Sequence, residues 1–190
     1  MDPAKFLYYP MRLLDHREME YRFCMQNIQF EDGLFLEFGV FKGQSINILS
    51  KLKPNKIFHG FDTFTGLPEE WDMGDKKIKA GHFYLDKMPN VEKNVILHKG
   101  LFESTIPEWQ KKYKGEISFI NIDCDLYSST KTVLTYLNKQ IVKNTIIRFD
   151  DLLPSPLRPY PNWIEGEWKA LSEWVQKFQR EIIPLARSWK

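Results

Sequence analysis

Short apolar runs alternate along the chain with longer segments in which apolar residues recur at helical spacing. The runs that have the length of β-strands lie at 34–38, 56–61, 95–98, 117–122 and 145–149. Helices are predicted at 12–30 (one or two), 45–52, 104–112, 128–139 and 164–180, with a weaker signal at 88–93. A sixth strand is predicted at 181–186, where Pro184 would confine it to a sheet edge.

Strands that alternate with helices pair in parallel through right-handed crossovers. We therefore predict an α/β fold, a three-layer sandwich around a Rossmann-like, mostly parallel sheet. One domain is expected over 1–190, with an N-terminal helical cap at 1–32 and the core at 33–190. The irregular segment 63–89 is long enough to act as a lid or binding loop.

Composition narrows the range of functions. Apolar residues make up 43% and charged residues 27% of the 190 residues, as in a globular domain. The net charge of +2 comes from basic residues interleaved with acids, so we expect no nucleic-acid partner. The sequence shows neither a signal peptide nor an apolar stretch of roughly 18 residues, so we expect no membrane partner. The only cysteines are Cys24 and Cys124, and we predict a cytoplasmic protein.

The ends of the predicted strands carry the candidate chemistry, because ligands of open α/β sheets bind beyond the carboxyl ends of the strands. The first strand ends in Glu37, followed by glycines at 39 and 43. This spacing lacks the three glycines of a dinucleotide-binding turn. An acidic turn suits a ligand with an amino group and no phosphate, such as the methionine part of S-adenosylmethionine. The alternative is an ordinary strand-to-helix turn.

Asp62 ends the second predicted strand, about 20 residues beyond the glycine turn. A carboxylate at this position can accept hydrogen bonds from both ribose hydroxyls of a nucleoside. The alternative is that Asp62 caps the turn at 63–66.

Four aspartates follow the fourth and fifth predicted strands: Asp123, Asp125, Asp150 and Asp151. Adjacent strands bring their ends within about 5 Å, where like charges repel unless a cation compensates them. Oxygen ligands favour a hard ion such as Mg²⁺, Mn²⁺ or Ca²⁺. The alternative is that these side chains cap a helix and a turn.

Five blocks of the sequence, taken in order, resemble the macrocin O-methyltransferase family of class I methyltransferases. The blocks span 36–43, 60–68, 100–107, 123–130 and 149–151. Two features depart from that family. Lys143, Asn144 and Thr145 stand where glycines usually precede the fifth strand, and the chain stops where the class usually closes its sheet with a final strand hairpin.

The resemblance implies a Rossmann-like sheet, S-adenosylmethionine as cofactor and Mg²⁺, or another hard divalent cation, as a second one. It implies that Glu37 and Gly39 hold the methionine end, Asp62 the ribose and Phe64 the nucleoside border. It places Gly100 and Phe102 beside the adenine. Asp123, Asp150 and Asp151 would bind the metal, and the base would be either Asp123 or Asp125. The complete predicted cofactor-binding set is Glu37, Gly39, Gly43, Ser45, Asp62, Phe64, Gly100 and Phe102.

The predicted function is metal-assisted O-methylation of a small-molecule hydroxyl acceptor, such as a sugar or a glycosylated metabolite. A non-catalytic binding module of the same fold is the alternative, and a homodimer is left open. A nicotinamide dehydrogenase and a nucleic-acid N-methyltransferase are disfavoured because their motifs are missing. The segment 160–163 is a candidate wall of the acceptor pocket, whereas Trp163, Trp168 and Trp174 are expected mainly in the core.

Overall fold

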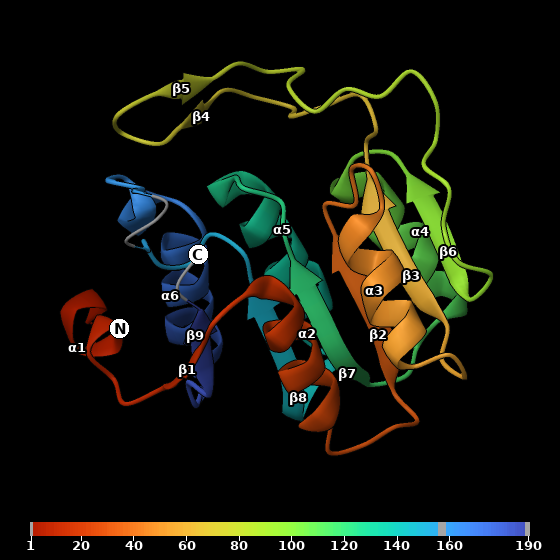
Figure 1. Cartoon of the computed structure of the whole chain (residues 1–190), viewed down its shortest axis with the longest axis horizontal. Coiled ribbons are helices and arrows are strands. Elements are labelled where there is room, and N and C mark those ends of the chain that lie inside the picture. The colour runs from red at the N-terminus through yellow and green to blue at the C-terminus, as the bar shows by residue number, and fades with distance from the viewer. Residues whose placement is uncertain (1, 156–158, 189–190) are drawn as a thin grey trace.

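A five-stranded sheet forms the centre of the computed structural model, which describes residues 2–155 and 159–188 (Figure 1). All of its neighbouring strands pair in parallel, in the order β6-β3-β2-β7-β8. The strands are β2 (Leu34–Phe38), β3 (Phe58–Asp62), β6 (Val95–Lys99), β7 (Ile117–Ile122) and β8 (Ile141–Phe149). The chain reverses direction across the sheet between β2 and β7, a switch point at which α/β proteins bind ligands.

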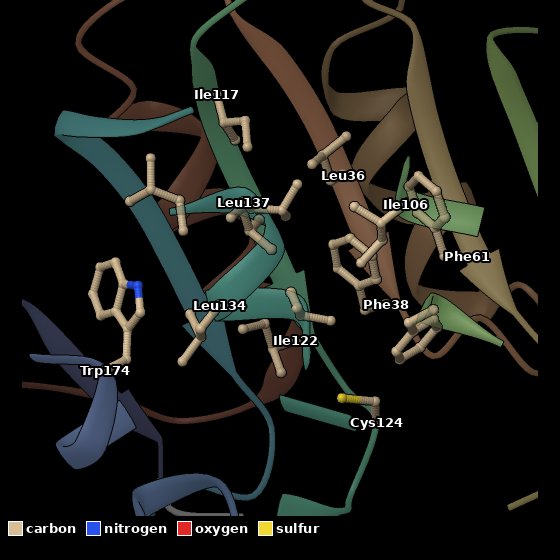
Figure 2. Close-up of a cluster of buried hydrophobic side chains, with 14 of the residues drawn as sticks. Leu36, Phe38, Phe61, Ile106, Ile117, Ile122, Cys124, Leu134, Leu137 and Trp174 are labelled. Carbon is tan, nitrogen blue, oxygen red and sulfur yellow. The ribbon is translucent and has the colours of Figure 1, made fainter. Parts of the chain in front are cut away.

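Helices cover both faces of this sheet, which gives the predicted three layers. One face packs against α4 (Phe102–Lys112), α5 (Tyr127–Leu137) and α6 (Glu167–Phe178), and Figure 2 shows the buried side chains between them. The other face packs against α2 (Arg17–Gln26) and α3 (Gln44–Leu52). In β2, Leu36 and Phe38 point to the first layer and Phe35 to the second. This alternation explains why the strand is apolar at every one of these positions.

The N-terminal and C-terminal segments differ from the sequence-based expectation. The predicted helical cap contains α1 (Pro3–Leu7) and α2, but β1 (Arg12–Leu14) lies between them. The sixth strand is not at 181–186: β9 (Ala186–Ser188) begins at the end of that range and pairs in parallel with β1, away from the central sheet. The weak helical signal at 88–93 was wrong, because those residues are in a loop.

The irregular segment 63–89 contains a short hairpin of β4 (Trp71–Asp72) and β5 (Lys77–Ile78), which runs above the carboxyl ends of the strands (Figure 1). A separate hydrophobic cluster anchors it, in which Trp71 and Met73 pack with Leu126 and Tyr160. The long predicted helix is split into a short 3-10 helix, η1 (Trp163–Glu165), and α6. Over the described residues, no helix is long and apolar enough to span a membrane.

Candidate active site

The turn between β2 and α3 brings two strand ends unusually close. Gly39 has a φ of +86°, and a Cβ there would lie 1.7 Å from the carbonyl oxygen of Asp123. Any side chain at Gly39 would therefore separate the ends of β2 and β7. Gly43, with a φ of +76°, precedes the first residue of α3. The glycine spacing seen in the sequence is thus required by backbone packing at the place where a ligand would bind.

A cavity of about 460 Å³ opens at the carboxyl ends of the strands. Seven of the predicted site residues contribute to its lining: Gly39, Ser45, Asp62, Phe102, Asp123, Asp125 and Asp150. Within the part of the chain that the structure describes, the lining does not include Glu37, Gly43, Phe64, Gly100 or Asp151. The predicted residues therefore divide into a group that a ligand can touch and a group behind it.

Glu37 belongs to the group behind the cavity wall. Its side chain is fully buried and accepts hydrogen bonds from Ser45 Oγ at 2.8 Å and Asn121 Nδ2 at 3.0 Å. Burial raises the pKa of the Glu37 carboxyl to about 8, against the lowering effect of the Ser45 hydrogen bond. Glu37 does not line the cavity itself, but its hydrogen-bond partner Ser45 does.

Asp62 lies in the cavity wall, where backbone amides engage both of its carboxylate oxygens. Oδ2 accepts from the amides of Val40 and Phe41, each at 2.8 Å, and Oδ1 accepts from the amide of Phe64 at 2.7 Å. A carboxylate oxygen can accept about two hydrogen bonds, which leaves capacity on Oδ1. A ribose that contacts both oxygens would have to displace one of the amides on Oδ2.

The remaining residues predicted on the nucleoside side differ in exposure. Phe64 is buried in the core cluster beneath α2 and α3, so in this conformation it packs inside the protein. Gly100 has a φ of +140°, and its amide donates to the Asp62 carbonyl at 2.9 Å. Phe102 lines the cavity and packs edge-on against Phe38, with ring centroids 5.2 Å apart.

Three aspartates converge at the ends of β7 and β8. Carboxylate oxygens of Asp123, Asp150 and Asp151, one from each residue, lie within 4.8 Å of one another. Burial and then the charge of Asp150 raise the pKa of Asp123 to about 7. Burial and the charge of Asp151 hold the pKa of Asp125 well above its ordinary value, and the two side chains are hydrogen-bonded. This cluster therefore retains protons or requires a cation.

Two arginines compensate part of this charge, and the sequence analysis identified neither. Arg148 donates to Asp150 Oδ1 at 2.6 Å, and Arg17 donates to Asp150 Oδ2 at 2.9 Å. Arg148 also donates to Asn121 Oδ1 at 2.8 Å. Its position two residues before Asp150, as the one charged residue of the predicted strand 145–149, is a signal that could have identified it. Arg17 lies far away in sequence, and no local pattern marks it.

Glu167 is a further acid that the sequence analysis missed. It is fully buried at the start of α6, and its Oε2 accepts from the Asp151 amide at 3.0 Å. Its Oε1 has no hydrogen-bond partner among the described residues. Burial and the charge of Asp151 raise the pKa of Glu167 well above its ordinary value. It therefore fixes the backbone of Asp151 from behind the site.

The candidate acceptor wall at 160–163 lies elsewhere. The Tyr160 hydroxyl accepts from Trp71 Nε1 at 3.1 Å within the cluster that anchors the β4–β5 hairpin. None of these four residues is in the described lining of the cavity. Trp168 and Trp174 are buried, as expected of core residues, and Trp163 is half-buried.

A family model described as "Methyltransferase domain" matches residues 36–152, a range that begins within β2, ends beyond β8 and includes every predicted site residue. The chain belongs to this methyltransferase family. The match confirms that the sequence blocks identify a methyltransferase, and the family indicates S-adenosylmethionine as the methyl donor. A search of curated proteins finds no match to this sequence.

Solved structures share the fold of this methyltransferase. The calicheamicin methyltransferase CalS11 superposes with a TM-score of 0.67 at 24% identity, over 82% of this chain and 69% of that chain. Apo CalS11, described as a TDP-rhamnose 3'-O-methyltransferase, gives a TM-score of 0.59 at 21% identity, over 82% and 68%. The O-methyltransferase NovP gives 0.61 at 20% identity, over 90% and 76%. These likenesses confirm the Rossmann-like class I fold.

Proposed function

We propose that this methyltransferase transfers a methyl group to a hydroxyl of a small molecule, assisted by a divalent metal ion bound to Asp123, Asp150 and Asp151. The observation that carries the proposal is the convergence of these three carboxylates, whose oxygens lie within 4.8 Å of one another. Two of them also line the cavity. A donor set made only of oxygens suits Mg²⁺ or Mn²⁺.

The cofactor side of the proposal rests on the opposite part of the same cavity. Gly39 lets the ends of β2 and β7 meet at the cavity wall, and Ser45 presents a hydroxyl that Glu37 orients. Asp62 retains acceptor capacity for a ribose hydroxyl on Oδ1. Phe102 supplies an apolar edge on which an adenine can lie.

The acidic side would provide the proton acceptor. A bound divalent cation supplies stabilisation of alkoxide character on the acceptor oxygen. Asp123 or Asp125 would take the hydroxyl proton, because burial in the metal-free protein raises the pKa of both carboxyls and so favours their protonated forms. The cavity walls align the acceptor oxygen with the methyl group, an effect that can account for roughly 7–11 kcal/mol of the barrier.

A sugar or a glycosylated metabolite is the acceptor class that we propose. Its support is the shared fold with CalS11, which is described as acting on TDP-rhamnose. A cavity of about 460 Å³ also lies in the range usual for small-molecule sites.

The test is a methyl-transfer screen over glycosides, phenols and sugar nucleotides, with S-adenosylmethionine and Mg²⁺ present. Release of S-adenosylhomocysteine reports turnover, and NMR of the product locates the new methyl group. We expect an O-methyl ether on a sugar. Methylation at nitrogen or carbon would contradict the proposal. Tight cofactor binding without turnover on any acceptor class would favour the non-catalytic module instead.

A further inference from the structure

Arg17 pairs with the Asp150 carboxylate at the edge of the cavity. Its Nη2 lies 2.9 Å from Asp150 Oδ2, and the side chain of Arg17 is 44% exposed whereas that of Asp150 is 2% exposed. Arg17 also lines the cavity. The guanidinium therefore stands between solvent and one of the three proposed metal ligands.

The position of Arg17 in its own helix makes this contact informative. Arg17 is the first residue of α2, where the helix dipole disfavours a cation. The preceding residue, His16, makes no side-chain cap hydrogen bond that would compensate for it. The ion pair with Asp150 offsets this unfavourable placement. The N-terminus of α2 thus places the Arg17 cation beside the aspartates, although the helix dipole disfavours a cation there.

The second arginine at Asp150 is held differently. The side chain of Arg148 is 5% exposed and pairs with Asp150 Oδ1 at 2.6 Å and with Glu20 Oε2 at 2.7 Å. It is further fixed by Asn121 and lies over the ring of Tyr21 at 4.9 Å. Compared with Arg148, the Arg17 guanidinium can move away from Asp150 without breaking the buried hydrogen bonds to Glu20 and Asn121.

We infer that Arg17 competes with the divalent metal ion for Asp150. This inference rests on the metal part of the proposed function. A guanidinium and a dication beside the same carboxylate repel each other strongly in a site of low solvent exposure. Metal binding would therefore displace the partly exposed Arg17 side chain from Asp150 and leave Arg148 in place. In the metal-free protein, Arg17 compensates the charge of the aspartates and lowers their affinity for the ion.

The experiment is calorimetric titration of the purified protein with Mn²⁺ at fixed pH and ionic strength. Arg17→Gln removes the competing charge, so we expect it to bind Mn²⁺ at least about 10-fold more tightly than the wild type. Arg22→Gln is the matched control, because it makes the same charge change in the same helix. The Arg22 guanidinium pairs with Glu18 at 2.7 Å on the surface. Its affinity for Mn²⁺ should stay within about 2-fold of the wild type.

Equal or weaker Mn²⁺ binding by Arg17→Gln, with a wild type that binds the ion, would overturn the inference and leave the metal proposal standing. Absence of Mn²⁺ binding in all three proteins would instead refute the metal proposal itself. A measurement on the wild type avoids any dependence on the folding of a variant. On titration with Mg²⁺, the side-chain NMR signal of Arg17 should shift more than that of Arg148, which keeps its hydrogen bonds. An unmoved Arg17 signal at saturating Mg²⁺ would equally overturn the competition.

Discussion

Arg148 and Asp150, two residues apart at the end of β8, form a 2.6 Å ion pair in which both side chains are almost completely buried. The same arginine donates to Asn121, whose amide donates in turn to Glu37. The proposed metal site and the proposed cofactor site therefore share one buried network beneath the floor of the cavity.

The first prediction is that Asp123 and Asp150 contribute differently to the free energy of unfolding of the metal-free protein. Asp123→Asn removes a charge that burial and Asp150 already disfavour, so the free energy of unfolding should stay equal or rise. Asp150→Asn weakens both arginine pairs and should lower the free energy of unfolding by about 1–3 kcal/mol. Urea denaturation in EDTA measures both. Equal destabilisation by the two variants would contradict this account of the charges.

The second prediction concerns pH and Glu37. Its pKa in the folded protein is about 8, against an ordinary value of 4.5. At a pH between these two pKa values, Glu37 is protonated in the folded protein and ionised in the unfolded chain. The stabilising contribution is present below pH 4.5 and is lost as the pH rises to about 8.

Glu37→Gln cannot titrate but can still form hydrogen bonds with Ser45 and Asn121. We expect the fall in the free energy of unfolding between pH 5 and 8 to be shallower in this variant, by up to about 1.4 kcal/mol per pH unit. Urea denaturation of the metal-free protein at several pH values measures the slope. Asp123 titrates in both proteins, so the difference in slope reports the titration of Glu37 together with its charge interaction with Asp123. Identical slopes would show that Glu37 is ionised throughout.

The third prediction concerns Asp62 and the cofactor. Asp62→Asn should weaken binding of S-adenosylhomocysteine by about 10-fold or more, because a hydrogen bond to a charged group is worth roughly 1.5–3 kcal/mol. The control is Asp72→Asn, which makes the same change at a carboxylate outside the cavity lining, where Oδ1 accepts from the Gly74 amide at 2.8 Å and caps a turn. Calorimetry should show unchanged affinity in the control. If Asp62→Asn also binds normally, Asp62 only caps the turn.

The strands of the central sheet were predictable because each is a short apolar run that ends in a polar residue or a glycine. Burial on both faces imposes that pattern on β2, β3 and β7, so the sequence records these strands directly. The register at the strand ends then follows from parallel pairing, which is why Asp123 and Asp150 could be expected to meet. The pairing of β1 with β9 was not predictable, since three-residue strands far apart in the chain carry no periodicity.

The candidate site was predictable only in part for a similar reason. Residues at strand ends are marked by their position, whereas Arg17 and Glu167 reach the cluster from helices that pack against the sheet. Their roles depend on tertiary packing. Phe64 shows the opposite case: its place in a sequence block suggested a ligand contact, but its side chain fills the core beneath α2 and α3.

The fourth prediction separates a base from a metal ligand. Asp125 has a φ of +62°, a conformation that asparagine tolerates, so Asp125→Asn should fold normally. If Asp125 is the base, this variant keeps the rise in melting temperature caused by Mg²⁺ but loses turnover by orders of magnitude. Thermal denaturation with and without Mg²⁺, followed by the methyl-transfer assay, provides both readings. If the variant retains turnover, Asp125 is not the base, and Asp123 would accept the hydroxyl proton instead.

Metal dependence of turnover tests the central claim most directly. With an acceptor identified by the screen, the initial rate of methyl transfer is measured in excess EDTA and again after Mg²⁺ is restored. We predict that chelation lowers the rate by orders of magnitude and that Mg²⁺ recovers it, because alkoxide stabilisation and acceptor orientation both depend on the ion. An undiminished rate in EDTA would contradict the claim, and Asp123, Asp150 and Asp151 would then act without a metal.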